Sequence, residues 1–276
     1  MNKLQVMVFN VGHGLSVALV ERPENYVILV DLGADTRFTP LKFMSLKLKL
    51  RPDVLYITHP HADHLDDIET ALDKSFRPLG LHYQAYDWGD VKRREKKELA
   101  YKVDKFVELQ RVVPYRTYGG YATLYCWRYT PAKSMEHFGD AKYVNNSSLF
   151  LIYKWRDFKI AIAGDLESDA MAGMVGSNAV QETARGTNIL IAPHHGHKNG
   201  FPLDWTAKLG KPNLSIISVQ SRDKSVDSRY ESANFARGVK FGGKTRYSLT
   251  TRLDGSVLVT MSYGTDDKPK WMFTPF

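Results

Sequence analysis

The sequence contains a single cysteine, Cys126, among its 276 residues. One cysteine excludes an internal disulfide and therefore the class of secreted proteins that disulfides hold together. No apolar run approaches the roughly 20 residues that a membrane-spanning helix needs. The chain also lacks the basic start, apolar stretch and cleavage site of a signal peptide. We therefore expect a soluble, cytoplasmic protein with no membrane segment, in which Cys126 is a small apolar residue of a strand.

The composition excludes a disordered chain and has an excess of positive charge. Hydrophobic residues make up 43% and charged residues 25%, which is typical of a protein with a packed core. Lys and Arg number 38 against 30 Asp and Glu, so the formal net charge is +8. Such a balance favours polyanionic partners, nucleic acid above all, although many basic proteins bind none.

Strand-like and helix-like patterns alternate along the chain. The predicted strands are 3–10, 15–21, 26–31, 54–58, 81–88, 121–129, 148–154, 158–163, 189–192, 214–219, 246–250 and 257–261. The predicted helices are 37–50, 65–72, 88–113, 168–184 and 202–209. This order fits two mixed sheets with helices outside. No linker-like composition interrupts it, so we predict a single domain over residues 1–276.

A basic helical and aromatic insertion is predicted at about residues 81–130. Its helical part, 88–113, carries lysines and arginines interleaved with acids. Such mixed charge is typical of a solvated helix face stabilised by pairs three and four residues apart. A nucleic-acid contact is the alternative. The tyrosine-rich segment 114–129 is typical of edge-strand aromatics, with base stacking as its alternative.

The segment His59-Pro-His61-Ala-Asp63-His64 follows the apolar run 54–58 directly. It lies on a predicted strand-to-helix loop, where binding residues commonly collect. Imidazole and carboxylate are ligands that suit zinc, manganese and iron. A polar loop rich in histidine by chance is the alternative, but three imidazoles and a carboxylate in six residues indicate a metal site.

Two later strands also end in residues of ligand type. Asp165 follows the run 161–164, and the pair His194-His195 follows the run 189–193. A turn-capping aspartate and a hydrogen-bonded buried histidine are the respective structural alternatives. Because several strand ends carry such residues in one chain, a shared metal centre explains them better.

The order of HxHxDH, NNSSLFL, AGD and PHHG resembles the metallo-β-lactamase superfamily. The resemblance is closest to the metallohydrolase domain of ComEC-type DNA-uptake proteins, and it extends to the turns 9–16 and 31–33 and the segments 211–219 and 250–257. The HxHxDH motif is highly specific for the superfamily, and the PHHG and NNSS segments are moderately specific for the branch. The resemblance implies an α+β fold, a metallo-β-lactamase-like αββα four-layer sandwich.

The resemblance also implies two divalent metal ions, Zn²⁺ or Mn²⁺. His59 and His61 would bind the first ion, and Asp63 with His64 the second. Asp165 would bridge the two, and one residue of the pair His194-His195 would complete the second; we favour His195. Superfamily members commonly place a third histidine for the first metal where this chain has Asn145-Asn146-Ser147. We therefore expect the first site to bind weakly.

Two departures from the branch bear on substrate handling. The branch usually has serine after HHG, where this chain has His197 and Lys198, and it tends to have a histidine after the SV turn, where residues 220–225 contain none. Our hypothesis is that His197 replaces the lost group as a proton donor. Lys198, with Arg222 or Lys224, would neutralise transition-state charge.

The predicted function is a metal-dependent phosphodiesterase, specifically a nuclease that acts on DNA, with Asp63 or Asp165 orienting the attacking hydroxide. A hydrolase of small phosphodiesters, such as cyclic nucleotides or phosphorylcholine esters, is the first alternative. A non-catalytic subunit that binds nucleic acid or a partner protein is the second. Standalone members of this branch can act beside partner proteins, so a protein partner in a multi-component system is a further expectation.

Overall fold

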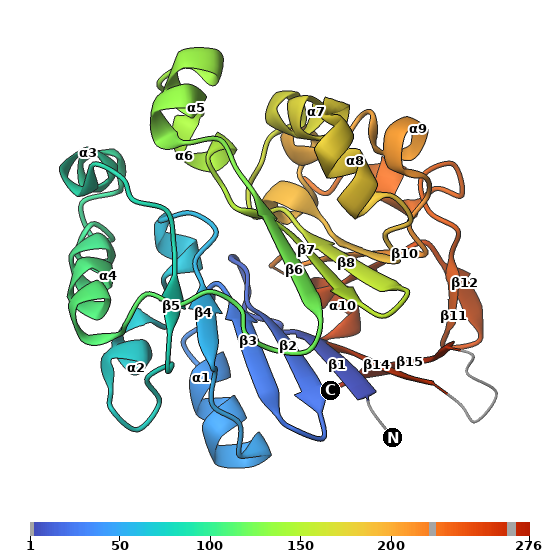
Figure 1. Cartoon of the computed structure of the whole chain (residues 1–276), viewed down its shortest axis with the longest axis horizontal. Helices are drawn as coiled ribbons and strands as arrows, with labels where there is room; N and C mark the ends of the chain where they lie inside the picture. The colour runs from blue at the N-terminus through green and yellow to red at the C-terminus, as the bar shows by residue number, and fades with distance from the viewer. Residues whose placement is uncertain (1–2, 221–224, 264–268) are drawn as a thin grey trace. The chain divides into compact units, whose positions relative to one another are not determined.

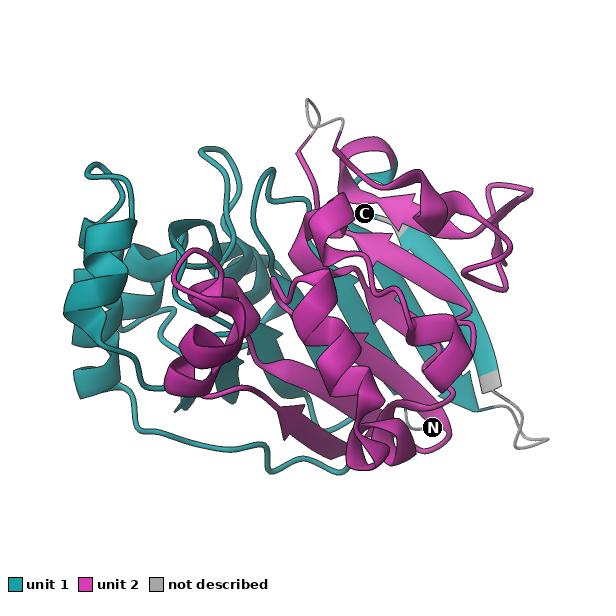
Figure 2. Ribbon diagram, turned by 90° about the horizontal axis from the view of Figure 1, so that it is seen from above, with its two compact units in different colours: residues 1–121, 254–276 teal, residues 122–253 magenta. Residues whose placement is uncertain are grey.

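The computed structural model describes residues 3–220, 225–263 and 269–276. The chain divides into two compact units, which Figure 2 shows in different colours: unit 1 comprises residues 1–121 and 254–276, and unit 2 comprises residues 122–253. Each unit has its own sheet and its own helices. The prediction of a single domain with an insertion at about 81–130 stays a prediction.

Unit 1 is built on a seven-stranded mixed sheet with the order β15-β14-β1-β2-β3-β4-β5. The strands are β1 (Lys3–Val8), β2 (Val17–Arg22), β3 (Tyr26–Val30), β4 (Val54–Tyr56), β5 (Leu81–His82), β14 (Val257–Tyr263) and β15 (Pro269–Pro275). The pairs from β15 to β3 are antiparallel, whereas β3, β4 and β5 run parallel. The loop that follows β4 therefore begins at the carboxyl edge of a parallel strand, where ligand-binding loops collect.

The helical elements of unit 1 are α1 (Pro40–Phe43), a π-helix η1 (Met44–Leu48), a 3₁₀ turn η2 (Ala62–His64), α2 (Ile68–Leu72), α3 (Trp88–Arg94) and α4 (Tyr101–Val112). One face of the sheet packs on the apolar sides of these helices. Leu29 and Leu55 from the strands share a core with Met44, Ile68 and Phe106. Burial of such side chains is the main stabilising contribution to the unit.

Unit 2 contains a six-stranded mixed sheet with the order β13-β10-β9-β8-β7-β6. The strands are β6 (Thr123–Trp127), β7 (Phe150–Trp155), β8 (Phe158–Ile162), β9 (Ile189–Ile191), β10 (Leu214–Ile217) and β13 (Ser248–Thr250). Strands β8, β9, β10 and β13 run parallel, so the segments after β8 and β9 leave the sheet at the same edge. Cys126 lies in β6, where burial raises the pKa of its thiol to about 11.

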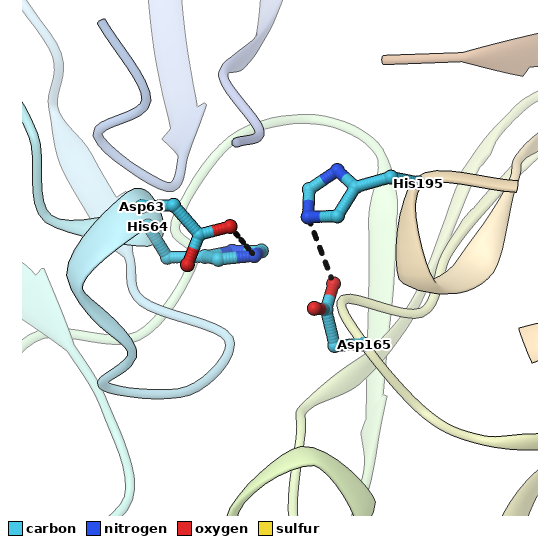
Figure 3. A group of neighbouring side chains, drawn as sticks. All are labelled: Asp63, His64, Asp165 and His195. Atoms are coloured by element: carbon cyan, nitrogen blue, oxygen red, sulfur yellow. Dashed lines mark ion pairs between the residues drawn. The ribbon is translucent and has the colours of Figure 1, made fainter. Parts of the chain in front are cut away.

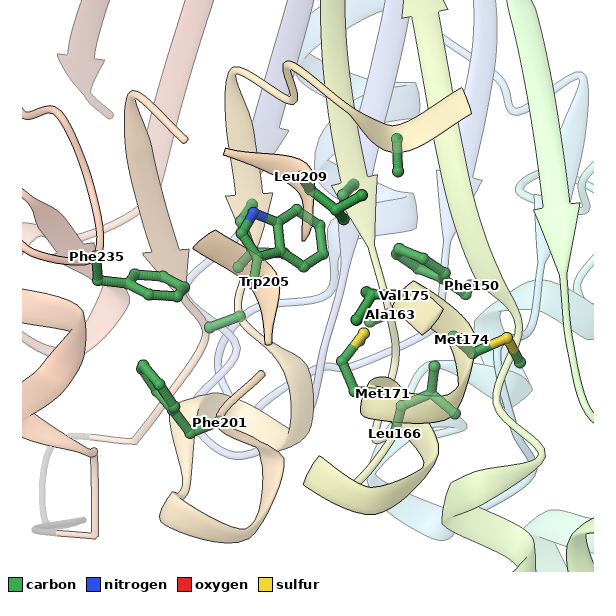
Figure 4. Packing of buried hydrophobic residues seen from close by; sticks show 14 of the residues in the cluster. Phe150, Ala163, Leu166, Met171, Met174, Val175, Phe201, Trp205, Leu209 and Phe235 are labelled. Atoms are coloured by element: carbon green, nitrogen blue, oxygen red, sulfur yellow. The ribbon is translucent and has the colours of Figure 1, made fainter. Parts of the chain in front are cut away.

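The helical elements of unit 2 are α5 (Pro131–Phe138), α6 (Tyr143–Asn146), α7 (Ser168–Gly176), α8 (Asn178–Ala184), η3 (Pro193–Gly196), η4 (Lys198–Gly200), α9 (Trp205–Leu209) and η5 (Ser228–Glu231). Strands β11 (Val239–Phe241) and β12 (Lys244–Arg246) form a hairpin, and α10 (Thr251–Asp254) spans the boundary between the units in the sequence. Figure 1 shows α7, α8 and α9 beside the sheet. Their apolar side chains, among them Met171 and Trp205, pack on Phe150 of β7 (Figure 4).

The structure corrects three predicted elements. The single helix over 88–113 is two helices, α3 and α4, because the backbone becomes extended at Glu95. The helix over 168–184 is also two, α7 and α8, which separate at Gly176-Ser177. The strand predicted over 81–88 is only the two-residue β5. Within the described parts of the chain, no helix is both long and apolar enough to span a bilayer.

Candidate metal centre

The HxHxDH residues of unit 1 lie on the loop that follows β4 and on the turn η2. His59 and His64 are buried, whereas His61 and Asp63 are partly exposed. Figure 3 shows Asp63 and His64 side by side, with Asp63 Oδ2 3.7 Å from His64 Nε2. The ring of His59 lies 4.1 Å from that of His64 and 4.7 Å from that of His61, between centroids. The four ligand-type residues of this loop therefore form one group.

A buried carboxylate that the motif does not contain sets the orientation of His64. Nδ1 of His64 lies 2.8 Å from Oδ2 of Asp31, and both side chains are fully buried. Thr58 donates to the same carboxylate from its backbone N–H and from its hydroxyl, each at 2.7 Å. Burial raises the pKa of the Asp31 carboxyl, and these contacts oppose that shift. Because a carboxylate only accepts, Nδ1 of His64 carries the proton and Nε2 keeps a lone pair for a metal.

His13 is a second residue that sequence reasoning did not assign to the site. Its Nε2 lies 3.5 Å from Oδ2 of Asp63, and half of its side chain is exposed. The turn that carries it packs closely on the motif, since a Cβ on Gly14 would lie 2.2 Å from the carbonyl oxygen of Asp63. The sequence signals at this position were the pair of glycines that flank His13 and the resemblance of the turn 9–16 to the family.

The unit 2 residues lie on the segments that follow β8 and β9. Asp165 Oδ1 lies 3.5 Å from His195 Nε2, and Figure 3 shows the two side chains pointing toward each other. Asp165 Oδ2 lies 4.0 Å from Nε2 of His194. His195 is buried and His194 is partly exposed. Asp165, His194 and His195 therefore form a second group of ligand-type side chains.

The orientation of His195 repeats that of His64. Its Nδ1 lies 3.2 Å from the carbonyl oxygen of Ser218, an atom that only accepts, so its Nε2 also keeps a lone pair. The backbone of His194 and His195 is left-handed, with φ of 49° and 52°. Such a conformation is costly for residues other than glycine and is concentrated at functional sites. We interpret this strain as a result of holding both imidazoles at one turn.

The NNSS segment has a structural role in unit 2. Ser148 accepts a hydrogen bond from the backbone N–H of Asp165 at 3.1 Å, and Asn146 accepts one from the N–H of Glu167 at 2.8 Å. The hydroxyl of Ser147 donates to the carbonyl of Tyr143 at 2.7 Å. The contacts of Ser148 and Asn146 join the NNSS segment to the AGD turn and the residues just after it.

His197 and Lys198 follow η3 at the surface. Nδ1 of His197 accepts a hydrogen bond from the N–H of Asn199 at 3.3 Å, so the neutral ring carries its proton on Nε2. Lys198 is exposed and lines a cavity of about 420 Å³ together with Lys142. Lys142 is ion-paired with Glu167 and Asp169, at 3.0 and 2.9 Å. Arg222 and Lys224 lie outside the described residues.

The donor set of each group fits a divalent transition metal. Imidazole nitrogen and carboxylate oxygen are the ligands that zinc and manganese take in proteins. Metal-binding histidines almost always donate their second ring N–H to a carboxylate or a backbone carbonyl. His64 has the first arrangement, with Asp31, and His195 has the second, with Ser218.

No protein-family model matches the sequence, and no curated protein matches it. Several solved structures resemble it. The metallo-beta-lactamase fold protein YhfI from Bacillus subtilis is 12% identical, with a TM-score of 0.51 over 91% of this chain and 96% of that chain. A mutant of CmlA beta-hydroxylase is 15% identical, with a TM-score of 0.50 over 79% of this chain and 46% of that chain. Igni18, a metallo hydrolase from the archaeon Ignicoccus hospitalis, is 12% identical, with a TM-score of 0.49 over 94% of this chain and all of that chain.

The likeness to YhfI shows that this chain has the metallo-β-lactamase fold. The predicted fold class, α+β of the metallo-β-lactamase type, is therefore confirmed. At an identity of 12% the likeness concerns the fold alone. Because one fold hosts many activities, the function must be argued from the site.

Proposed function

We propose that the chain is a metal-dependent phosphodiester hydrolase, and specifically a nuclease that acts on DNA. The observation that carries the proposal is the matched orientation of His64 and His195. Each ring directs its protonated Nδ1 at an oxygen that can only accept, which leaves Nε2 as the metal-binding atom. Chance burial of two histidines would not require the same nitrogen to be engaged in both.

The resemblance supplies the proposed ligands. Asp63 and His64 would bind the second ion, Asp165 would bridge the two ions, and His195 would complete the second. His59 and His61 would bind the other ion. With no third histidine nearby in the motif, we propose that this first site binds weakly. His194 is the alternative ligand to His195, and its greater exposure argues against it.

Bound Zn²⁺ or Mn²⁺ would lower the pKa of water and stabilise negative charge on phosphodiester oxygens. Around that chemistry, the carboxylate of Asp63 or Asp165 would orient the attacking water by accepting its hydrogen bond. As an imidazolium, protonated on both ring nitrogens, His197 would donate the proton on Nε2 to the leaving oxygen. The ammonium group of Lys198 would offset negative charge on the phosphoryl oxygens.

Charge supports a polymeric, polyanionic substrate. The net charge is +8, and in the described part of the chain Lys96 and Lys97 are exposed and have no acidic partner. Lys92 and Lys105 of the insertion are instead ion-paired, with Asp104 and Glu108 respectively. The resemblance to ComEC-type proteins points to the same substrate class. A cytoplasmic location and a protein partner are parts of the same proposal.

A substrate panel tests the proposal. The purified protein and an Asp63→Ala/His64→Ala double variant are incubated with plasmid, linear single-stranded DNA, RNA and cyclic nucleotides, each with Mn²⁺, Mg²⁺ or Zn²⁺. We expect metal-dependent DNA cleavage by the wild-type protein alone. Cleavage of cyclic nucleotides only would favour a small-phosphodiester hydrolase. A chain that holds less than one metal ion and is inert with Mn²⁺ would favour a binding subunit.

A further inference from the structure

Two side chains of the helical insertion contact the backbone of one residue of the metal motif, Ala62, one at its N–H and the other at its carbonyl. Oε1 of Glu95 accepts a hydrogen bond from the backbone N–H of Ala62 at 2.9 Å. Nζ of Lys102 lies 3.4 Å from the carbonyl oxygen of the same residue. Ala62 lies between His61 and Asp63, and it begins the turn η2 that carries Asp63 and His64.

Lys102 is itself held firmly. It is buried at the start of α4, and its ammonium group is hydrogen-bonded to the carboxylate of Asp66. Asp66 in turn accepts a hydrogen bond from the backbone N–H of Ala34, in the loop that follows β3. Burying a lysine is unfavourable unless its charge is paired and hydrogen-bonded. Burial of the Lys102 ammonium group therefore costs desolvation free energy. Its hydrogen-bond partners are the carbonyl of Ala62, in the metal motif, and the carboxylate of Asp66, two residues after the motif.

The break between α3 and α4 lies at Glu95. The backbone turns to an extended conformation at this residue, where α3 ends, and its carboxylate is directed at the metal loop. Its neighbours Lys96 and Lys97 remain exposed. Because the helix ends at Glu95, the carboxylate of this residue can contact the backbone N–H of Ala62.

We infer that Glu95 and Lys102 are positioning residues that preorganise the metal motif and thereby raise its metal affinity. Neither side chain is proposed to bind the metal; they act through the backbone N–H and the backbone carbonyl of Ala62. Ligands held within a fraction of an ångström of their binding geometry bind more tightly, because less conformational freedom is lost on binding. The inference rests on the proposed metal-binding function of His59 to His64.

Metal affinity of four variants tests the inference. Glu95→Ala and Lys102→Ala remove the two contacts, whereas Glu98→Ala and Lys105→Ala remove exposed charges of the same insertion. Zn²⁺ dissociation constants are measured by competition with a chromophoric chelator, and Co²⁺ absorption reports the ligand geometry. We expect Glu95→Ala and Lys102→Ala to weaken Zn²⁺ binding about 10-fold or more and to alter the Co²⁺ spectrum, as changes behind metal ligands do. The two control variants are expected to bind as the wild type does.

A conservative variant separates positioning from general stability. Glu95→Gln retains an oxygen that accepts the Ala62 N–H, so we expect it to restore most of the lost affinity. Thermal unfolding of the metal-free proteins is measured in parallel, and Glu95→Ala remains the decisive variant if Lys102→Ala does not fold. Wild-type affinity in Glu95→Ala, with or without a lower unfolding temperature, would overturn the inference. A wild-type protein that binds no metal would instead overturn the proposed function.

Discussion

His64 donates from Nδ1 to the carboxylate of Asp31 across 2.8 Å, and both side chains are excluded from solvent. This contact joins the loop after β3 to the metal motif. A histidine held in this way keeps one tautomer and one ring orientation, which are the conditions for binding a metal through Nε2.

Asp31→Asn is expected to weaken divalent metal binding by roughly 10- to 100-fold. The amide can donate to Nδ1 of His64, which would move the proton to Nε2 and block the proposed metal-binding atom. Asp35→Asn, a change at an acid of the same loop, serves as the control. Zn²⁺ titration of both variants is the measurement, and equal affinities would contradict the role of Asp31.

His197→Ala is expected to reduce turnover about 10²-fold or more, with metal content unchanged. The reason is that His197 is proposed to supply a proton and not to bind the metal. Turnover is followed with a DNA substrate, and bound metal is counted by elemental analysis. Loss of metal in the variant would show that His197 is a ligand and would refute its role as a proton donor.

Neutralising Lys96 and Lys97 together is expected to weaken DNA binding about 10-fold near 50 mM salt and to lower the salt-dependence slope by about 2. Each lysine that contacts a phosphate releases about 0.9 counterion, whereas an ion-paired lysine contributes less. The matched control, Lys92→Gln/Lys105→Gln, removes the same charge from residues that have acidic partners. Fluorescence anisotropy with a labelled oligonucleotide measures both, and identical losses would argue for net charge alone.

Asp67→Asn is expected to stabilise unit 1 increasingly as the pH rises from 4 to 7. Burial raises the pKa of Asp67 to about 6, although Thr70 and the N–H of Leu41 favour its charged form. The folded state then binds more protons than the unfolded state between these pKa values, so Asp67 lowers stability as it ionises. The shift corresponds to about 3 kcal/mol at pH 7. Urea unfolding of both proteins at pH 4 and pH 7 measures the difference, and a gap that does not change with pH would contradict it.

Gly14→Ala is expected to lower the free energy of unfolding by about 2–5 kcal/mol and to weaken metal binding. Its Cβ would lie 2.2 Å from the carbonyl oxygen of Asp63, and its φ of 108° is already unfavourable for alanine. Gly12→Ala is the matched control, since its φ is also positive but its Cβ would meet nothing closer than 3.9 Å. Denaturant unfolding should show a clearly smaller loss for Gly12→Ala. Similar losses of unfolding free energy in the two variants would mean that the positive φ of each glycine accounts for the effect and that the contact with Asp63 does not.

Much of the strand pattern was predictable from sequence because alternating and apolar runs report burial directly. Residues 26–31 and 158–163 matched β3 and β8 to within one residue at each end. The helix over 88–113 was predicted wrongly as a single element. Its helical spacing continues through Glu95, but the backbone is extended at that residue, and Oε1 of Glu95 accepts a hydrogen bond from the N–H of Ala62. Helical spacing within residues 88–113 cannot indicate a hydrogen bond between Glu95 and the distant Ala62.

The sequence by itself determined which residues are of metal-ligand type and where they lie along the chain. His59 to His64, Asp165 and the pair His194-His195 are ligand types at strand ends, and that much follows from residue identity and short-range spacing. The tertiary structure alone decided which nitrogen each histidine presents, because Asp31 and Ser218 are 33 and 23 residues away from the rings that they orient. It also decided what holds the motif in place, since Lys102 reaches Ala62 across 40 residues of chain. Hydrogen-bond partners of this kind depend on how the strands and helices pack, which no local pattern encodes.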